Sequence, residues 1–378
     1  MKKIFYWTEA FFTIVGAVVG LGIFSIPYAS KNIGVLPGVI LIICVTLIMM
    51  FLNILFAEII IFDKKDDCIV GYSRKYLGGW AGKIEFFSIL FGYGGSLVAY
   101  ILATAVFTEG ILSMDKAYFW PIVLIFTAVN SMVLLNGFRG FGKIELVFSV
   151  LMCGMFFLVS YESLPHWSSL NENWSGLLVP YGVVIFALTG QSSIPIAIKI
   201  LGAEKKKIRE VIVYAYIFIA IITILFFISA IKTSGLEVTP NPFISMSKKM
   251  GSGILYLGSL LGLITVITSH WAIAIYLKKI LISDIKLKTI LSWFLVVFAP
   301  LTLILAGVSN FVHIIGLVGV VAGTTDALII VAVYRKIFHK KKSKPIVLPW
   351  KLPRYLTWTI FLLLVFAAIS SILSSVKG

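Results

Sequence analysis

Two short stretches, Gly22-Ile-Phe-Ser-Ile-Pro27 and Gly190-Gln-Ser-Ser-Ile-Pro195, have nearly the same sequence although they lie far apart in the chain. The likeness extends to two further pairs, Ala29 with Ala197 and Lys31 with Lys199. Each stretch lies inside an apolar run long enough to cross a membrane, and each contains Gly and Pro, which interrupt helices. Paired, interrupted spans at corresponding positions of two halves indicate the binding site of a transporter.

The composition excludes an ordinary soluble domain. Mean hydropathy is +1.05, and 60% of the residues are apolar while 13% are charged. Runs such as Pro37–Phe62, Val211–Ile231 and Tyr355–Leu373 hold almost no charge and reach the roughly 20 residues that a hydrocarbon core of about 30 Å requires. The first apolar run is too long and too rich in Gly for the core of a cleavable signal peptide. The chain is therefore expected to be an all-α polytopic membrane protein.

The apolar runs and the residues that separate them predict about eleven transmembrane helices. Their expected positions are 8–31, 36–62, 84–112, 118–137, 143–162, 177–199, 210–232, 252–278, 289–308, 311–334 and 355–374.

The basic residues predict the orientation of these spans. With a cytoplasmic N-terminus, the inner segments hold 26 of the 32 Lys and Arg residues, and the outer segments hold the other 6. Inner loops carry such an excess by the positive-inside rule, so the N-terminus is expected in the cytoplasm and the C-terminus outside. The formal net charge of +16 then reflects topology and contact with anionic lipid, and no nucleic-acid partner is expected.

With this topology, the repeated motif at Gly22–Pro27 and Gly190–Pro195 belongs to an inverted repeat. The first span runs outward and the sixth runs inward, so the two copies are antiparallel. Repeat one covers about 8–162, repeat two covers about 177–334, and an extra helix covers about 355–374, all within one transmembrane domain, 1–378. Two such halves rock about a central site.

The interrupted spans also suggest a ligand. Backbone groups freed at membrane depth persist only where they line a polar cavity or meet a ligand. The N-termini of half-helices favour a carboxylate, and exposed carbonyls favour a cation or an ammonium group. Two opposed breaks therefore suit a zwitterion such as an amino acid. The alternative reading of Gly16-x-x-x-Gly20 is close helix packing.

Three segments carry a resemblance to a known family. Ile14–Ala29 followed by Gly34 resembles the first span of the amino acid/auxin permease family, within the amino acid–polyamine–organocation superfamily. Tyr76–Lys83 is similar to that family's inner loop before span 3, and Phe186–Pro195 is similar to its broken sixth span. The resemblance implies a LeuT-like 5+5 inverted repeat with discontinuous helices 1 and 6. It further implies an amino acid permease of the cell membrane, a secondary transporter driven by a sodium or proton gradient.

The same resemblance places the substrate between the two breaks. The implied substrate-binding residues are Val19, Gly20, Leu21, Gly22, Ile23, Phe186, Thr189, Gly190 and Gln191, with Tyr93, Ser96 and Tyr100 of span 3. The spacing of the span 3 residues puts them broadly on one helix face. A Gly-rich packing helix with interfacial tyrosines explains span 3 equally well.

Span 8 and span 10 supply the candidates for ion coupling. Thr268 and Ser269 could form a sodium site with carbonyls of the span 1 break, although such hydroxyls often bond the carbonyl one turn back. His270 could carry a proton or simply pack. Asp326 is the deepest of the intramembrane acids, which are functional suspects. Beyond a sodium ion at Thr268 and Ser269, no metal and no cofactor is expected, and the coupling ion is either a proton or sodium.

Other positions are less decisive. Sodium-coupled relatives tend to carry Asn where this chain has Gly16, and Lys199 replaces an acidic residue that often follows the sixth span. Glu58 and Glu109 lie close to the ends of their spans, where relay, gating and ordinary roles all remain open. Three cysteines, Cys44, Cys68 and Cys153, show no metal or redox spacing and are expected to be packing residues.

Together these features predict an amino acid:cation symporter that works by alternating access, as a monomer and without enzymatic activity. The alternative is a nutrient-sensing, germinant-receptor-like subunit that binds an amino acid on the same fold without transporting it. A membrane enzyme would need a clustered nucleophile, metal or acid–base set, which the sequence does not offer.

Overall fold

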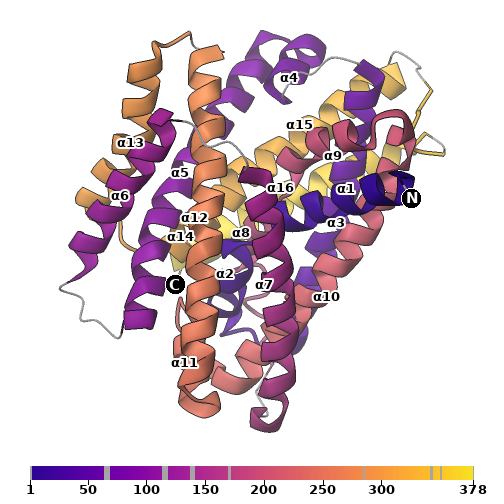
Figure 1. Cartoon of the computed structure of the whole chain (residues 1–378). Coiled ribbons are helices and arrows are strands. Elements are labelled where there is room, and N and C mark those ends of the chain that lie inside the picture. The colour runs from indigo at the N-terminus through magenta and orange to yellow at the C-terminus, as the bar shows by residue number, and fades with distance from the viewer. Residues whose placement is uncertain are drawn as a thin grey trace.

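The computed structural model describes residues 2–63, 69–112, 118–136, 141–168, 172–283, 286–340, 344–349 and 351–377. All regular secondary structure in these ranges is helical (Figure 1). The α-helices are α1 (Lys2–Val18), α2 (Leu21–Ser30), α3 (Val35–Asp63), α4 (Ile69–Leu77), α5 (Gly79–Leu112), α6 (Phe119–Asn136), α7 (Phe141–Ser163), α8 (Tyr181–Leu188), α9 (Ile194–Leu201), α10 (Ile208–Ser234), α11 (Pro242–Met250), α12 (Ser252–Ser283), α13 (Thr289–Leu305), α14 (Phe311–Val318), α15 (Thr324–Arg335) and α16 (Arg354–Lys377).

Each predicted span coincides with a helix or a pair of helices. Six helical stretches in the described residues are long and apolar enough to cross a membrane, and the bent pair α1–α2 is a seventh. One of the six stretches, Tyr181–Glu237, contains two predicted spans, while α6 and α13 are shorter apolar helices. The prediction of an all-α polytopic fold with about eleven spans is confirmed.

The first span is broken where the sequence predicted. Its two halves, α1 and α2, are bent by 45°. Gly20 lies between them with an extended backbone (φ −155°, ψ −158°). Helical hydrogen bonding therefore stops at this point, in the middle of an apolar run.

The sixth span is broken in the same manner. α8 ends at Leu188, Thr189 is extended (φ −72°, ψ 120°), and a 3₁₀ turn over Gln191–Ser193 leads into α9. Pro195 occupies the first turn of α9, where its missing N–H breaks no helical hydrogen bond. Both breaks of the inverted repeat are thus confirmed.

The broken helices pack against each other across the repeat. α1 contacts α9, and α2 contacts α8, so each half of one broken span lies beside the opposite half of the other. Around them, α3 packs on α10, and the long helices α5 and α12 run along each other. The span α14–α15 contains a π-helical segment, η6 (Gly319–Gly323), which rests on α8.

Short helices cover the two ends of the bundle. Figure 1 shows α4 at one end and α11 at the opposite end. α4 is amphipathic, since it buries Tyr72 and Tyr76 and exposes Arg74 and Lys75. α11 begins at an Asn241 cap, whose Oδ1 accepts the backbone N–H of Phe243 at 3.1 Å.

The three cysteines do not form a site that the structure describes. Cys153 is buried in the core, Cys44 is exposed on α3, and Cys68 lies outside the described residues.

Candidate functional site

The two breaks contact each other through glycines. A Cβ added to Gly22 would lie 2.4 Å from the Cα of Ala187, and a Cβ added to Gly190 would lie 2.7 Å from Cγ2 of Val18. Real Cβ atoms do not approach other atoms so closely, so only glycine permits this approach of the backbones. The structure therefore brings Gly22 and Gly190 to one place in the fold.

At the contact of the two breaks, the apolar residues of the first break contribute backbone groups rather than side chains. The side chains of Val19, Leu21 and Ile23 are at most 2% exposed and belong to the main hydrophobic core. The first N–H groups of α2, in contrast, have no partner within their own helix. N–H groups at the start of a helix can bind an anion.

The second break is held by a hydrogen-bond chain that the sequence did not reveal. The Tyr216 hydroxyl of α10 donates to the Leu188 carbonyl at 3.0 Å and accepts from Nδ2 of Asn53 on α3 at 2.7 Å. Both side chains are fully buried. The chain fixes the end of α8 to two neighbouring helices, and its only signal in the sequence is one Asn and one Tyr within apolar spans.

The polar side chains of the second break differ in their partners. Thr189 Oγ1 donates to the Ile185 carbonyl at 2.7 Å. Gln191 is 8% exposed, and its Nε2 lacks a hydrogen-bond partner among the described residues. Phe186 is half-buried at the end of α8. Gln191 is thus the side chain here with donor capacity left for a ligand.

The three candidates on α5 occupy different surroundings. Tyr93 packs its ring on Tyr276 of α12, with the centroids 5.4 Å apart. Ser96 Oγ donates to the Gly92 carbonyl one turn back, at 2.7 Å. Tyr100 is buried, and its ring lies 6.4 Å from that of His270. The contacts of Tyr93 and Tyr100 therefore face α12.

On α12, Ser269 is the hydroxyl that faces the first break. A Cβ on Gly20 would lie 3.7 Å from Ser269 Oγ and 3.9 Å from Cγ2 of Thr265. Thr268 instead donates to the Thr265 carbonyl at 3.0 Å, which is the local bond expected for an ordinary helical Thr. His270 is buried between the rings of Tyr100 and Phe126.

Asp326 lies at the contact of α15 with α5. Its Oδ1 accepts the Ser88 hydroxyl at 3.0 Å. Glu85, one turn before Ser88 on α5, has a fully buried side chain. The sequence did not single out Glu85, because it follows Lys83 at the end of a span and looks like an interfacial acid.

Glu58 binds backbone rather than ions. Its carboxylate accepts the N–H groups of three consecutive residues, Ile346, Val347 and Leu348, the last two at 2.9 and 2.8 Å. Glu58 is fully buried, and Val347 is 7% exposed. The segment 344–349, which we call the strap, is therefore fastened to α3 at the α4 end of the bundle. Glu109 is half-buried near the opposite end of α5.

Asp63 joins α3 to α4 at the same end. It hydrogen-bonds to Tyr76 at 2.8 Å and pairs with Lys75. The hydrogen bond to Asp63 raises the pKa of Lys75. Burial, followed by the bond to Asp63, raises the pKa of Tyr76. Both groups stay protonated and keep donating to Asp63.

A cluster of five buried phenylalanines closes the bundle on the α11 side of the first break. Phe24 of α2 is its centre, with ring centroids 5.5 to 5.7 Å from those of its neighbours. These neighbours are Phe107, Phe156, Phe226 and Phe243, from four different helices. All five rings are fully buried. The sequence did not reveal this cluster, because no local spacing relates its members.

Comparison with solved structures identifies the fold. The chain is similar to MhsT, solved in complex with L-phenylalanine, with a TM-score of 0.66 and 14% sequence identity. The similarity covers 97% of this chain and 98% of that chain. It confirms the LeuT-like fold.

Comparison with protein families corrects the resemblance drawn from the sequence. No curated protein matches the chain, but the model of the tryptophan/tyrosine permease family matches residues 5–373. The resemblance is thus confirmed for the superfamily and the LeuT-like fold, but not for the amino acid/auxin permease family. The motif around Gly22 is short, so it does not separate families that share this broken span. The chain belongs to the tryptophan/tyrosine permease family.

Proposed function

We propose that the chain is a secondary active transporter that carries an aromatic L-amino acid together with a cation across the cell membrane. The family description names tryptophan and tyrosine, and the structural neighbour was solved with L-phenylalanine. The observation that carries the proposal is the direct contact of the two broken spans at Gly22 and Gly190.

This arrangement suits an amino acid. The substrate carboxylate would accept from N–H groups at the start of α2, where the helix dipole also favours negative charge. The substrate ammonium would donate to carbonyls at the end of α8. Gln191 would add its amide N–H, which has no hydrogen-bond partner among the described residues, and Phe186 would lie against the aromatic ring.

The cation is sodium or a proton. For sodium, Ser269 and the carbonyls of the first break provide hard oxygen donors. Thr265 turns its methyl group toward Gly20, and the Thr268 hydroxyl is bonded to the helix. The fit to sodium is therefore partial, since one hydroxyl oxygen faces the break. For a proton, the candidates are Asp326 and His270.

Transport would proceed by alternating access, with the two repeats, about 8–162 and 177–334, rocking about the site in a monomer. The excess of Lys and Arg supports a cytoplasmic N-terminus and an extracytoplasmic C-terminus. In that orientation the Phe24 cluster lies on the outer side, and α4 with the strap lies on the cytoplasmic side. The conformation in hand would then be closed to the outside.

Uptake by the purified protein in proteoliposomes tests the proposal. Labelled tryptophan, tyrosine, phenylalanine, leucine and glutamate are offered under imposed sodium or proton gradients. We expect concentrative uptake of the aromatic substrates, and none of glutamate. Binding of an aromatic amino acid without uptake or exchange would instead support a receptor subunit. An absence of both binding and uptake would contradict the proposal.

A further inference from the structure

We propose that the junction of α15 and α16 binds the headgroup of an anionic phospholipid, and that Arg335 and Arg354 bind its phosphate. The junction lies at the α4 end of the bundle, where α15 continues through the π-helical segment η7 (Lys336–Lys340), which contacts α4. The inference goes beyond the proposed transport and does not depend on it.

The sequence of this junction is strongly cationic. Residues 335–354 contain eight Lys and Arg residues and neither Asp nor Glu. In the part of the chain that the structure describes, Arg335, Lys351 and Arg354 form no salt bridge, since the ion pairs there join other residues. The positive charge of these three side chains is therefore not balanced by a carboxylate of the described chain.

Two carboxylates of α3 at the same end of the bundle are bound elsewhere. Glu58 accepts backbone N–H groups of the strap, and Asp63 pairs with Lys75 and hydrogen-bonds to Tyr76. Neither carboxylate is left to neutralise the junction. A cluster of like charges without internal partners attracts an anion from outside the chain.

Arg335 is fixed against α16 and keeps donors for such an anion. Its guanidinium group lies on the ring of Trp358, with Cζ 3.9 Å from the ring centroid. Its Nη1 donates to Oγ1 of Thr357 at 3.3 Å. A guanidinium group carries its N–H donors in one plane, so stacking and a single hydrogen bond leave most of these donors at the edge of the group. Such an edge matches two oxygens of a phosphate.

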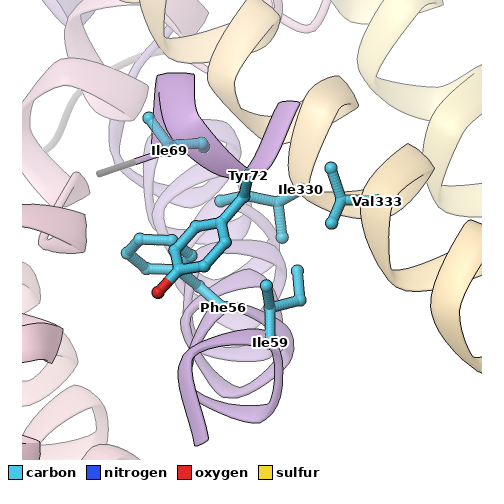
Figure 2. Close-up of a pocket in the computed structure, with 6 residues that line it drawn as sticks. All are labelled: Phe56, Ile59, Ile69, Tyr72, Ile330 and Val333. Carbon is cyan, nitrogen blue, oxygen red and sulfur yellow. The ribbon is translucent and has the colours of Figure 1, made fainter. Parts of the chain in front are cut away.

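Apolar packing on the other face of α15 directs Arg335 toward α16. Ile330 and Val333 of α15 line a small apolar pocket together with side chains of α3 and α4, as Figure 2 shows. Arg335 follows Val333 by two residues, which is about 200° around a helix. Its side chain therefore leaves α15 on the face away from this pocket, where α16 packs.

Arg354 begins the helical turn that Arg335 contacts. It precedes Trp358 by four residues, so the two side chains lie on one face of α16. Thr357 Oγ1, which accepts from Arg335, donates to the Arg354 carbonyl at 2.8 Å. The Arg354 side chain is exposed, and Lys351 lies three residues earlier, where the chain enters α16. Two guanidinium groups from two helices thus flank the same turn.

The surroundings of this turn favour a lipid over a dissolved anion. In the most apolar part of α16, 17% of the residues are buried inside the protein, so most of this helix faces lipid. Tyr355 and Trp358, near its start, are 73% and 50% exposed. Exposed Tyr and Trp are typical of the headgroup level of a membrane, and basic pockets between transmembrane helices bind acidic headgroups. In the proposed orientation the junction faces the cytoplasmic leaflet, whose surface is negatively charged.

A bound headgroup would also stabilise the fold. Its phosphate would offset the repulsion between Arg335 and Arg354 and would tie α16 to the last helix of repeat two. An anionic phospholipid should therefore raise the melting temperature of the purified protein more than a zwitterionic one does.

The test uses the full chain, purified in a neutral detergent. Native mass spectrometry measures the apparent affinity for phosphatidylglycerol and for phosphatidylcholine with the same acyl chains. Thermal unfolding is followed with each lipid and with inorganic phosphate. The variants are Arg335→Gln, Arg354→Gln and the conservative Arg335→Lys. Lys288→Gln is the matched control, because Lys288 is exposed at the start of α13 as Arg354 is exposed at the start of α16.

We expect the unmodified chain to bind phosphatidylglycerol more tightly than phosphatidylcholine. Arg335→Gln and Arg354→Gln should each weaken the apparent affinity for phosphatidylglycerol about fivefold, the factor that one basic residue near anionic lipid contributes. Arg335→Lys should lose less, because the charge remains while the planar fork is lost. Lys288→Gln should bind like the unmodified chain. Arg354→Gln changes an exposed side chain and should unfold without lipid at the unmodified temperature.

Equal affinity of the unmodified chain for the two lipids would overturn the proposal. Unmodified affinity for phosphatidylglycerol in Arg354→Gln would overturn it as well, and so would an equal loss in Lys288→Gln, which would mean that surface charge in general attracts the lipid. If inorganic phosphate raised the melting temperature as much as phosphatidylglycerol does, the site would bind a dissolved anion, and the assignment to a lipid would be wrong.

Discussion

The Cα of Ala187 lies 2.4 Å from the position that a Cβ on Gly22 would occupy. The obstacle is backbone, which cannot rotate away as a flexible side chain can. The contact joins the first helix after one break to the last helix before the other, so it measures how closely the two halves of the inverted repeat approach each other.

Gly22→Ala should therefore separate α2 from α8 and abolish substrate binding. The added methyl overpacks a close contact at a cost of about 1–3 kcal/mol, which a membrane-inserted chain is expected to survive. Binding is measured with labelled aromatic amino acid on the purified protein, and folding by size-exclusion chromatography. Gly94→Ala is the control, since no heavy atom lies within 4 Å of its Cβ position. Normal substrate binding by Gly22→Ala would show that the contact between the two breaks is not part of the substrate-binding site.

Gln191→Ala separates binding from stability. The buried Nε2 of Gln191 lacks a partner among the described residues, and an unsatisfied buried donor costs about 1–3 kcal/mol in the free protein. The variant should therefore unfold at the same or a higher temperature, while its KM for the aromatic substrate rises about tenfold or more. Ser192→Ala is the control, because Ser192 is exposed. A variant that loses stability but keeps its KM would assign Gln191 a structural role.

Tyr216→Phe removes the hydroxyl that holds the end of α8. It leaves the Leu188 carbonyl without this buried donor, at a cost of about 1–3 kcal/mol, while Asn53 Nδ2 keeps its bond to the Met49 carbonyl at 2.9 Å. Both the melting temperature and the transport rate should fall. Tyr214→Phe, on the exposed face of the same helix, should leave both unchanged. If Tyr216→Phe transports normally, the conformation of the second break does not depend on this hydrogen-bond chain.

The breaks could be predicted from the sequence because Gly and Pro act locally. Gly20 and Gly190 disfavour helix at their own positions, and the structure has the two breaks there, whereas Pro27 lies inside α2 and Pro195 lies in the first turn of α9. The partners of the breaks could not be predicted in this way. Tyr216 meets Asn53, which is 163 positions earlier in the chain, and this contact depends on how α3 and α10 pack.

For the acidic residues too, the position within a span could be predicted from the sequence, but the contact partners could not. The sequence placed Asp326 deep in a span, and its depth follows from the length of the apolar run alone. The contact of Asp326 with Ser88 could not be predicted, because the two residues are 238 positions apart in the chain. For Glu58, the sequence left the role open, because this residue lies near the end of its span. The structure shows that its buried carboxylate accepts backbone N–H groups of the strap.

Phe24→Ala should open the α11 side of the bundle. Truncating a fully buried Phe costs about 3–5 kcal/mol in lost packing, and here it also removes the ring that four other rings contact. In a background whose native cysteines are replaced by serine, Ser269→Cys reports access to the break. A membrane-impermeant thiol reagent added outside should label this cysteine faster when Phe24 is Ala. Phe366→Ala, an exposed position on α16, should not change the rate; an unchanged rate for Phe24→Ala would show that the cluster is no outer barrier.

Glu58→Gln should release the strap. A carboxylate accepts three backbone N–H groups at once, and hydrogen bonds to a charged acceptor contribute about 1.5–3 kcal/mol each. The amide keeps one oxygen and turns an NH₂ group toward N–H donors, so at least one of the three bonds is lost. Lys351 follows the bound residues and precedes Leu352, and trypsin should therefore cut the variant after Lys351 faster than it cuts the unmodified protein. Glu210→Gln, at an exposed position in the first turn of α10, should be cut at the unmodified rate, whereas slow cleavage of Glu58→Gln would mean that Val347 and Leu352 hold the strap by apolar packing alone.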